Sequence, residues 1–501
     1  MGTALLTIIE SLYVLCLLGL AIYGLNSLWL TLLYLRSKRQ PSASLPAGEI
    51  WTSWPRVTVQ LPIFNERYIV ERLLDAVVKL DYPRDRLQIQ VLDDSTDLTA
   101  TVVHHLVAQH QAQGLDIQLI HRTVRTGFKA GALAEGLKSA TGELIAIFDA
   151  DFVPEADWLR GAVPEFRDPR LGCLQTHWGH LNRNYNSLTQ AQALGVDGHF
   201  VVEQTARSRN GLFLNFNGTA GLWRRAAIDD VGGWQADTLT EDLDLSYRAQ
   251  LRGWRIGYLP DVIVPAELPA QMDAFKQQQF RWAKGTMQTL RKLLHRLWQA
   301  DIPWRVRLEA MIHLASYAVH PLMLMLLLLT PLIGMWAGAV QRFFPWSSLI
   351  AFGPPLLYSV AETADMPHLR DRLRVLPLLL LLGYGLSLNN SLAVVEGLIG
   401  RGGDFHRTPK FNLHDRVGHW ADSAYAMQHS SIAWGEISLA GYALGAIVVL
   451  WPKDGWVTIP WMMCYVAGYL FIAGLSFVQS QQLRHVQPRI SKPADRSAMS
   501  T

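Results

Sequence analysis

Cysteine is scarce in this sequence of 501 residues. The three cysteines, Cys16, Cys173 and Cys464, lie far apart and are odd in number, so they form neither a disulfide framework nor the spacing of a zinc site. This pattern fits a reducing, cytosolic environment for the folded part. The net charge is also small, at +3. It excludes the strongly basic surface that is typical of nucleic-acid-binding proteins, and we expect no nucleic-acid partner.

Hydrophobic residues, in contrast, make up 50% of the chain, and its mean hydropathy is +0.12. A chain this apolar is not wholly soluble. The first apolar run covers residues 4–35 and exceeds the ~20 residues that a straight membrane span needs. Arg36, Lys38 and Arg39 follow it, and the features of a cleaved signal peptide are missing. We therefore expect a retained anchor, with the residues after it in the cytosol.

Five later apolar runs indicate more membrane segments: residues 311–336, 349–358, 376–398, 437–450 and 461–478. The second run is short and contains Pro354 and Pro355, which favours a re-entrant or broken helix. The basic segments 401–410 and 484–501 belong in the cytosol by the positive-inside rule. We predict five crossings, with residues 349–358 not spanning and residues 370–374 outside. The protein is then a multi-pass protein of an inner or plasma membrane with a cytosolic catalytic domain.

Composition divides the chain into seven segments. They are an N-terminal transmembrane anchor (1–40), a globular domain (51–270), amphipathic interface helices (271–305), a transmembrane region (306–398), a cytosolic loop (399–432), a transmembrane hairpin (433–480) and a cytosolic tail (481–501).

Short apolar runs of strand length alternate with helical patterns in the globular domain. The strand-like runs are residues 56–63, 87–92, 116–120, 143–148 and 171–176, and the helical patterns are residues 66–80, 98–111 and 128–140. This alternation predicts an α/β domain with a largely parallel sheet, whose ligands bind beyond the carboxyl ends of the strands. Asp93-Asp94 and Asp149-Ala150-Asp151 each directly follow a predicted strand. We expect both acidic pairs at one edge of the sheet.

The acidic pairs have both functional and ordinary explanations. Asp149 and Asp151 suit a hard divalent cation, Mg²⁺ or Mn²⁺, that neutralises a departing diphosphate. A solvated turn explains this short motif equally well. Asp93 and Asp94 could hydrogen-bond a base or ribose, whereas Asp97 is explained by capping of the helix that follows.

Three further signals complete the candidate site. The turn Pro62-Ile63-Phe64-Asn65-Glu66 follows the first strand, and Lys129 opens a helix where a diphosphate could meet a cation and backbone N–H groups, unless it is simply solvated. In Thr240-Glu241-Asp242, Thr240 could cap a helix, but a transfer at an anomeric carbon also needs a base, and we choose Asp242.

One helix face collects Gln278, Arg281 and Trp282 at positions i, i+3 and i+4. Trp282 is suited to stacking on a sugar and Arg281 to holding a phosphate. The surrounding segment is basic and aromatic, so an interfacial helix on the membrane surface explains it too.

These motifs together resemble those of the processive family 2 glycosyltransferases, the group of cellulose and hyaluronan synthases. The paired Asp, Asp-x-Asp, Thr-Glu-Asp and Gln-x-x-Arg-Trp are all present and in order. The segments 91–97, 129–133 and 216–221 look most like those of the cellulose-synthase-like proteins that make mannan and xyloglucan backbones. The resemblance implies a GT-A fold, with a mostly parallel mixed sheet, inserted between transmembrane helices.

The resemblance also implies roles for single residues. Asp242 would be the base, and Asp149 and Asp151 the metal ligands. The implied nucleotide-sugar contacts are Pro62, Asn65, Glu66, Asp93, Asp94, Lys129, Asp151, Gln278 and Arg281. The implied acceptor contacts are Trp282, Asn217, Gly218, Thr219 and Glu241. The segment 405–410 is similar to a cellulose-synthase gating loop through Phe405, Thr408 and Lys410, although Arg407 replaces the usual valine.

We therefore expect an inverting transferase that moves a hexose from UDP-glucose or GDP-mannose to a growing β-glycan and passes the polymer along the membrane helices. One alternative is a glycolipid synthase with an acceptor such as ceramide or diacylglycerol. Another is a transporter or scaffold with a nucleotide-binding insert, for which Glu10, Glu362 and Glu396 would mark a path. No inverted repeat supports the transporter.

Overall fold

The computed structural model describes residues 3–38, 54–336, 351–362, 374–400, 403, 405–428, 430–453 and 458–490. Its globular part is built on one sheet of seven strands in the order β3-β2-β1-β4-β6-β5-β7. The strands are β1 (Val57–Ile63), β2 (Leu87–Asp93), β3 (Ile117–His121), β4 (Leu144–Ile147), β5 (Leu171–His180), β6 (Gly221–Arg224) and β7 (Arg255–Ala266). Only β6 runs antiparallel to its neighbours, β4 and β5.

The sheet agrees with the predicted α/β architecture. All five expected strands are present, whereas β6 and β7 were not expected. Strands β1, β2 and β4 are almost fully buried, as strands covered on both faces are. β1 and β2 also carry buried polar side chains that pair with one another, such as Gln60 with Gln90. Because β1 pairs in parallel with both β2 and β4, their carboxyl ends meet at one edge. The two acidic pairs therefore lie at that edge, as predicted.

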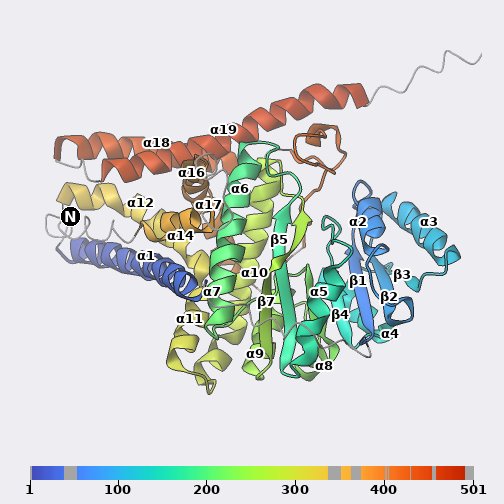
Figure 1. The fold of residues 1–501 in the computed structure, drawn as a ribbon. Helices are drawn as coiled ribbons and strands as arrows, with labels where there is room; N and C mark the ends of the chain where they lie inside the picture. Colours follow the sequence, from blue (N-terminus) through green and yellow to red (C-terminus); the bar gives the residue numbers. More distant parts are fainter. Residues whose placement is uncertain are drawn as a thin grey trace, which may run out of the picture.

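Helices cover both faces of the sheet and separate it from the apolar helices (Figure 1). Those of the globular part are α2 (Val70–Val77), α3 (Thr99–Ala112), α4 (Phe128–Ser139), α5 (Trp158–Ala162), α6 (Ser187–Asp197), α7 (Thr205–Arg209), α8 (Arg225–Asp230), α9 (Glu241–Leu251), α10 (Met272–Gln299) and α11 (Trp304–Leu314). A π-helix, η3 (Gly198–Gln204), joins α6 to α7.

Among the described residues, four helices are long and apolar enough to cross a membrane: α1 (Thr3–Ser37), α12 (Val319–Trp336), α18 (Ile432–Leu450) and α19 (Ile459–Ile490). The pair α16 (Leu376–Gly385) and α17 (Ser387–Ile399), bent by 49°, makes a fifth if it counts as one span. The described part of helix α14 (Gly353–Glu362) has 10 residues, fewer than a span needs. This count allows the five predicted crossings; the sidedness and the domain boundaries stay predictions.

Some sequence-based expectations fall on other parts of the chain. Residues 349–350, 370–373, 401–402 and 491–501 lie outside the described residues.

Helix α10 joins the globular part to the apolar helices. Figure 1 shows it between the sheet and α17, and it contacts α17 and α19. Near its start, Lys276 is 3% exposed and its ammonium lies 2.8 Å from Glu436 of α18 and 3.1 Å from the hydroxyl of Ser476 of α19. Lys276 thus links α10 to two apolar helices, through a buried ion pair with α18 and a hydrogen bond with α19.

Candidate active site

A cavity of about 890 Å³ begins at the acidic edge of the sheet and continues between the apolar helices. Most of the predicted site residues line it: Pro62, Glu66, Asp94, Lys129, Asp149, Asp151, Asn217, Gly218, Glu241, Asp242, Gln278, Arg281, Trp282, Phe405, Thr408 and Lys410. Asn65, Asp93 and Thr219 are not among its lining residues. The structure therefore brings together signals that are spread over about 350 positions of the sequence.

Each carboxylate of the Asp-x-Asp pair forms an ion pair with a lysine. Lys129, from α4, forms an ion pair with Asp149 and also donates to the carbonyl of Gly218 at 2.9 Å. Lys410 lies 2.6 Å from Asp151. Burial alone would lower the pKa of Lys129, but Asp149, Glu241 and Asp242 raise it above its ordinary value. Both lysines thus balance the charge of carboxylates that would hold a cation.

A metal ion at this place would have two carboxylate ligands from the protein. Among the described residues, no group of three or more His, Cys, Asp or Glu side chains is arranged to hold a metal. Hard cations such as Mg²⁺ and Mn²⁺ complete their coordination with water and phosphate oxygens. Asp149 and Asp151 therefore fit a cation that shares its ligands with a bound diphosphate.

Asp242 stands at the start of α9, beside the backbone of Gly218. A Cβ atom added to Gly218, whose φ is +84°, would lie 2.9 Å from Oδ2 of Asp242. Burial and the neighbouring Glu241 raise the pKa of Asp242 to about 7. A carboxylate with such a pKa is well matched to accept a proton near neutral pH.

The alternative of helix capping is supported at one position and not at the other. The side chain of Thr240 makes no capping hydrogen bond at the start of α9, and its hydroxyl lies 3.2 Å from that of Thr289 in α10. The carboxylate of Asp97, in contrast, accepts a hydrogen bond of 2.9 Å from the backbone of Thr99, in the first turn of α3. The acids after Thr240 are therefore not explained by its capping.

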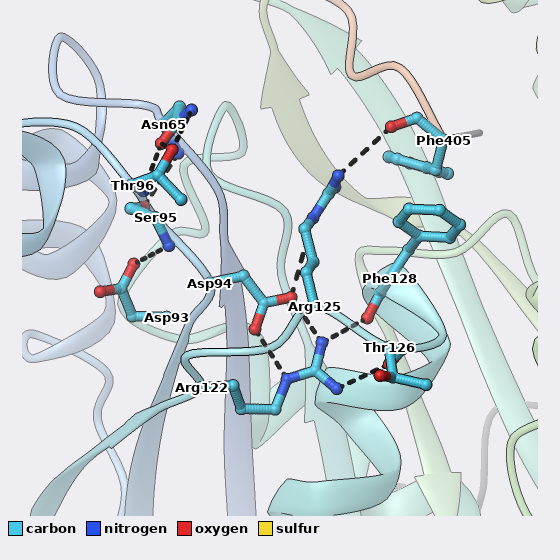
Figure 2. Close-up of polar contacts among 10 residues, drawn as sticks. All are labelled: Asn65, Asp93, Asp94, Ser95, Thr96, Arg122, Arg125, Thr126, Phe128 and Phe405. Atoms are coloured by element: carbon cyan, nitrogen blue, oxygen red, sulfur yellow. Dashed lines mark hydrogen bonds and ion pairs between the residues drawn. The ribbon is translucent and has the colours of Figure 1, made fainter.

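Asp94 is held by two arginines that the sequence motifs did not indicate (Figure 2). Arg122 donates two hydrogen bonds to the carboxylate of Asp94, from Nε at 2.7 Å and from Nη2 at 2.5 Å. The Nε of Arg125 lies 3.8 Å from the same carboxylate. Both arginines follow β3, and their spacing in His121-Arg122-Thr123-Val124-Arg125 is the signal that could have found them.

Three predicted site residues at this edge, Asp93, Asn65 and Thr219, do not line the cavity but form hydrogen bonds with neighbouring segments. Asp93 accepts a hydrogen bond from the backbone of Ser95 at 3.0 Å and lies 2.9 Å from the ring of His121. Asn65 accepts one from the backbone of Thr96 at 2.8 Å. The hydroxyl of Thr219 accepts one from the backbone of Asp149 at 2.9 Å. These three predicted ligand contacts are thus placed as neighbours of the cavity wall.

The gating-like segment 405–410 lies against the acidic edge. The ring of Phe405 stacks on Phe128 at 5.9 Å, the guanidinium of Arg281 lies 4.4 Å from its centre, and Arg125 donates to its carbonyl at 3.3 Å. The hydroxyl of Thr408 is buried and has no hydrogen-bond partner among the described residues. An unpaired hydroxyl at the cavity wall is a place for a ligand.

Glu267, also missed by the sequence analysis, holds the chain that follows this segment. It is 2% exposed, and its carboxylate accepts hydrogen bonds from the backbone of Phe411 at 2.6 Å and of Leu413 at 3.1 Å. Burial raises its pKa, and the nearby ammonium of Lys410 opposes that rise. Glu267 thus fixes the position of Lys410 beside Asp151.

Comparisons with known proteins agree with this site. Residues 55–285 match the family described as "Glycosyltransferase like family 2". The chain is 44% identical over 248 residues to glucomannan 4-beta-mannosyltransferase 2 of Arabidopsis thaliana, a match of 48% of this chain and 46% of that protein. It is 46% identical over 250 residues to the probable glucomannan 4-beta-mannosyltransferase 11 of Oryza sativa subsp. japonica, covering 48% and 43%. The chain thus spans about half the length of the curated relatives it matches.

A solved structure shares the fold. The mannosyltransferase PcManGT from Pyrobaculum calidifontis, in complex with GDP-Man and Mn²⁺, aligns with 78% of this chain and 99% of its own, at a TM-score of 0.53 and 23% identity. The predicted GT-A-like fold is confirmed.

Proposed function

Because residues 55–285 form a family 2 glycosyltransferase domain, we propose that the protein is a membrane-integrated, inverting glycosyltransferase. It transfers a hexose from a nucleotide sugar to a growing β-glycan and guides the product along its apolar helices. The observation that carries this proposal is the single cavity that joins Asp149, Asp151 and Asp242 to the apolar helices.

The donor would lie at the edge formed by β1, β2 and β4. Asp149 and Asp151 would hold Mn²⁺ or Mg²⁺ with the diphosphate, and the cation would stabilise the negative charge of the leaving group. Lys129, Lys410 and Arg281 supply further positive charge along the same wall. The relatives are named as mannosyltransferases and the structural neighbour is a complex with GDP-Man, which favours GDP-mannose over UDP-glucose as the donor.

The acceptor would enter from the side of Trp282, where an indole can stack on the apolar face of a sugar. Its hydroxyl oxygen attacks the anomeric carbon while its proton passes to Asp242. The bond between that carbon and the diphosphate oxygen breaks, and the configuration inverts. Two observations support Asp242 for this role: it lines the cavity, and its carboxylate lies close to the backbone of Gly218 on the same wall.

The cavity then continues past the catalytic residues. Its wall includes Tyr23 of α1, Leu326 of α12, Tyr384 of α16 and Tyr465 of α19. Aromatic side chains in this wall suit passage of a sugar chain, which supports a polymer product. The same opening between helices would also admit the lipid of a glycolipid acceptor, so the length of the product distinguishes the two functions.

The test is an incubation of the purified protein in lipid nanodiscs with GDP-mannose or UDP-glucose and Mn²⁺. We expect release of the nucleoside diphosphate and a long product that a mannan-specific hydrolase degrades. A single sugar on a lipid that extracts into organic solvent would instead establish a glycolipid synthase. Absence of turnover with every nucleotide sugar tested would contradict the proposed function.

A further inference from the structure

A π-helix forms part of the cavity wall and carries a polar cluster for which no role has been assigned. Within η3, His199 and Glu203 are four positions apart, and Nδ1 of His199 lies 2.9 Å from a carboxylate oxygen of Glu203. Both residues line the cavity, and their side chains are 25% and 30% exposed. π-Helical segments are uncommon and occur frequently at functional sites.

The cluster is an ordered chain of hydrogen bonds. Gln204 donates to Oδ1 of Asn217 at 2.8 Å, which sets the orientation of that amide. Nδ2 of Asn217 lies 3.1 Å from Nε2 of His199. Because an amide nitrogen only donates, Nε2 accepts, and Nδ1 of His199 carries the hydrogen that is donated to Glu203. The imidazole is thus held in one tautomer and orientation.

This chain ends beside the proposed base. Asn217 precedes Gly218, the residue whose backbone adjoins the carboxylate of Asp242. Asn217, at the end of the hydrogen-bond chain, is therefore one peptide unit from Gly218, which lies beside the proposed base.

The charge and surroundings of Glu203 suit a polyhydroxylated ligand. Burial alone would raise its pKa, but the hydrogen bond from His199 holds that pKa below its ordinary value, so the carboxylate is ionised. Among the described residues, no hydrogen bond reaches its Oε1. Two aromatic rings of the same wall, Trp178 and Phe200, pack at 5.1 Å. The carboxylate offers acceptors for sugar hydroxyls. Of the two rings, Phe200 is buried, and the partly exposed Trp178 offers a stacking surface on the same wall.

We propose that Glu203 and His199 form a subsite for the acceptor glycan, in which Glu203 accepts hydrogen bonds from sugar hydroxyls and His199 holds Glu203 in place. The inference rests on the proposed function. It assigns the selection of a carbohydrate acceptor to the π-helix and leaves donor binding to the edge of the sheet.

Glu203→Gln tests the subsite because it keeps the shape of the side chain and removes its charge. Two quantities are measured in nanodiscs: transfer to added manno- or gluco-oligosaccharides, and donor hydrolysis, in which water replaces the acceptor. We expect the KM for the oligosaccharide to rise about tenfold to a hundredfold, as for a lost hydrogen bond to a charged group. Hydrolysis changes less than about twofold, since donor contacts stay intact. His199→Ala is expected to raise the KM for the oligosaccharide as well.

Matched controls separate this effect from a general loss of structure. Glu135→Gln changes a carboxylate that pairs with Lys138 on the surface of α4, and His105→Ala changes an exposed histidine of α3. Neither residue lines the cavity, and neither variant is expected to alter the oligosaccharide KM.

A binding measurement makes the result independent of turnover. Oligosaccharide binding is followed by tryptophan fluorescence, and we expect it in the wild type and not in Glu203→Gln. An unchanged KM and unchanged binding in Glu203→Gln, with an active wild type, would overturn the subsite alone. A parallel loss of hydrolysis and transfer in Glu203→Gln would also overturn the subsite. A wild type that binds oligosaccharide but turns over no nucleotide sugar would instead overturn the proposed function.

Discussion

The proposed donor side and the proposed acceptor side of the cavity are built from different interactions. On the proposed donor side, carboxylates at the ends of strands pair with cations, as in Asp149 with Lys129 and Asp151 with Lys410. On the proposed acceptor side, β5 and η3 contribute the rings of Trp178 and Phe200, and hydrogen bonds orient Asn217. A charged leaving group needs the first kind of wall, and a neutral sugar needs the second. Asp242 stands where the two meet.

The sharpest test of this comparison is Asp242→Asn, which removes the carboxylate proposed as the base and leaves in place the ion pairs of Asp149 and Asp151 and the hydrogen bond between His199 and Asn217. We expect transfer to fall by about 10²–10⁴-fold, the usual contribution of a general base, while donor binding persists. Asp237→Asn, on the exposed partner of Lys292, is the control and keeps its activity. Near-normal transfer by Asp242→Asn would contradict the assignment.

The pH dependence of the same variant gives a second measure. Because Asp242 has a pKa of about 7, the wild-type kcat is expected to rise as the pH increases through 7. The raised pKa also means that the stability linked to Asp242 is fully present below the unfolded pKa near 4 and is lost as the pH rises through 7. Asp242→Asn removes this loss, so its unfolding temperature at pH 8 exceeds that of the wild type, and the two converge at pH 4.

Removal of the divalent cation tests the donor side alone. A chelator is expected to reduce transfer on the order of a hundredfold or more, since a bound cation supplies several kcal/mol of charge stabilisation. Oligosaccharide binding, a property of the acceptor side, is expected to persist. Mn²⁺ restores the wild type, but it does not restore Asp149→Asn. Full transfer in the presence of chelator would remove the metal from the mechanism.

Gly218→Ala tests the point where the two sides meet. The added methyl group would lie 2.9 Å from Asp242 and displaces its carboxylate, so kcat is expected to fall about tenfold to a hundredfold. Gly211→Ala is a matched control, because Gly211 also has a positive φ, of +64°, but has open space around it. Both variants lose about 1–2 kcal/mol of stability to backbone strain. Equal activity of the two variants would contradict the close approach of Gly218 to the base.

The smallest effect is expected at Arg125, whose guanidinium lies 3.5 Å from the ring centre of Phe64 and donates to Phe405. Arg125→Ala loosens the gating-like segment, and the donor KM rises about fivefold, the scale of one cation–π contact. The oligosaccharide KM stays unchanged. Arg86→Ala, on an exposed arginine, is the control. A change confined to the oligosaccharide KM would contradict the assignment of Arg125 to the donor side.

Local patterns predicted most of the donor side. The acids after β2 and β4 follow buried apolar strands, and parallel pairing brings them to one edge, so their grouping follows from the sequence alone. The family resemblance placed Lys410 near the site, where it pairs with Asp151 across 259 positions. Asn65, Asp93 and Thr219 lie outside the cavity lining, each with a hydrogen bond to a neighbouring backbone N–H, and their roles as ligand contacts stay predictions.

Long-range packing explains what the sequence did not predict. The pairing of Arg122 with Asp94 depends on β2 lying beside β3, and no motif marks Arg122. Strand β6 is short and follows a loop, so its antiparallel insertion between β4 and β5 left no periodic signal. The π-helix has the composition of an ordinary helix, and it packs against α14, a contact that the local sequence does not reveal.

The contacts of Lys276 with Glu436 and Ser476 affect where the chain can be cut to produce a soluble fragment. The family match ends at residue 285, in the middle of a helix that continues to Gln299. A soluble fragment cut at that boundary would lose Glu436 and Ser476 and leave the ammonium of Lys276 without its counter-charge. The family match therefore leaves out the two partners of Lys276 and the last part of α10.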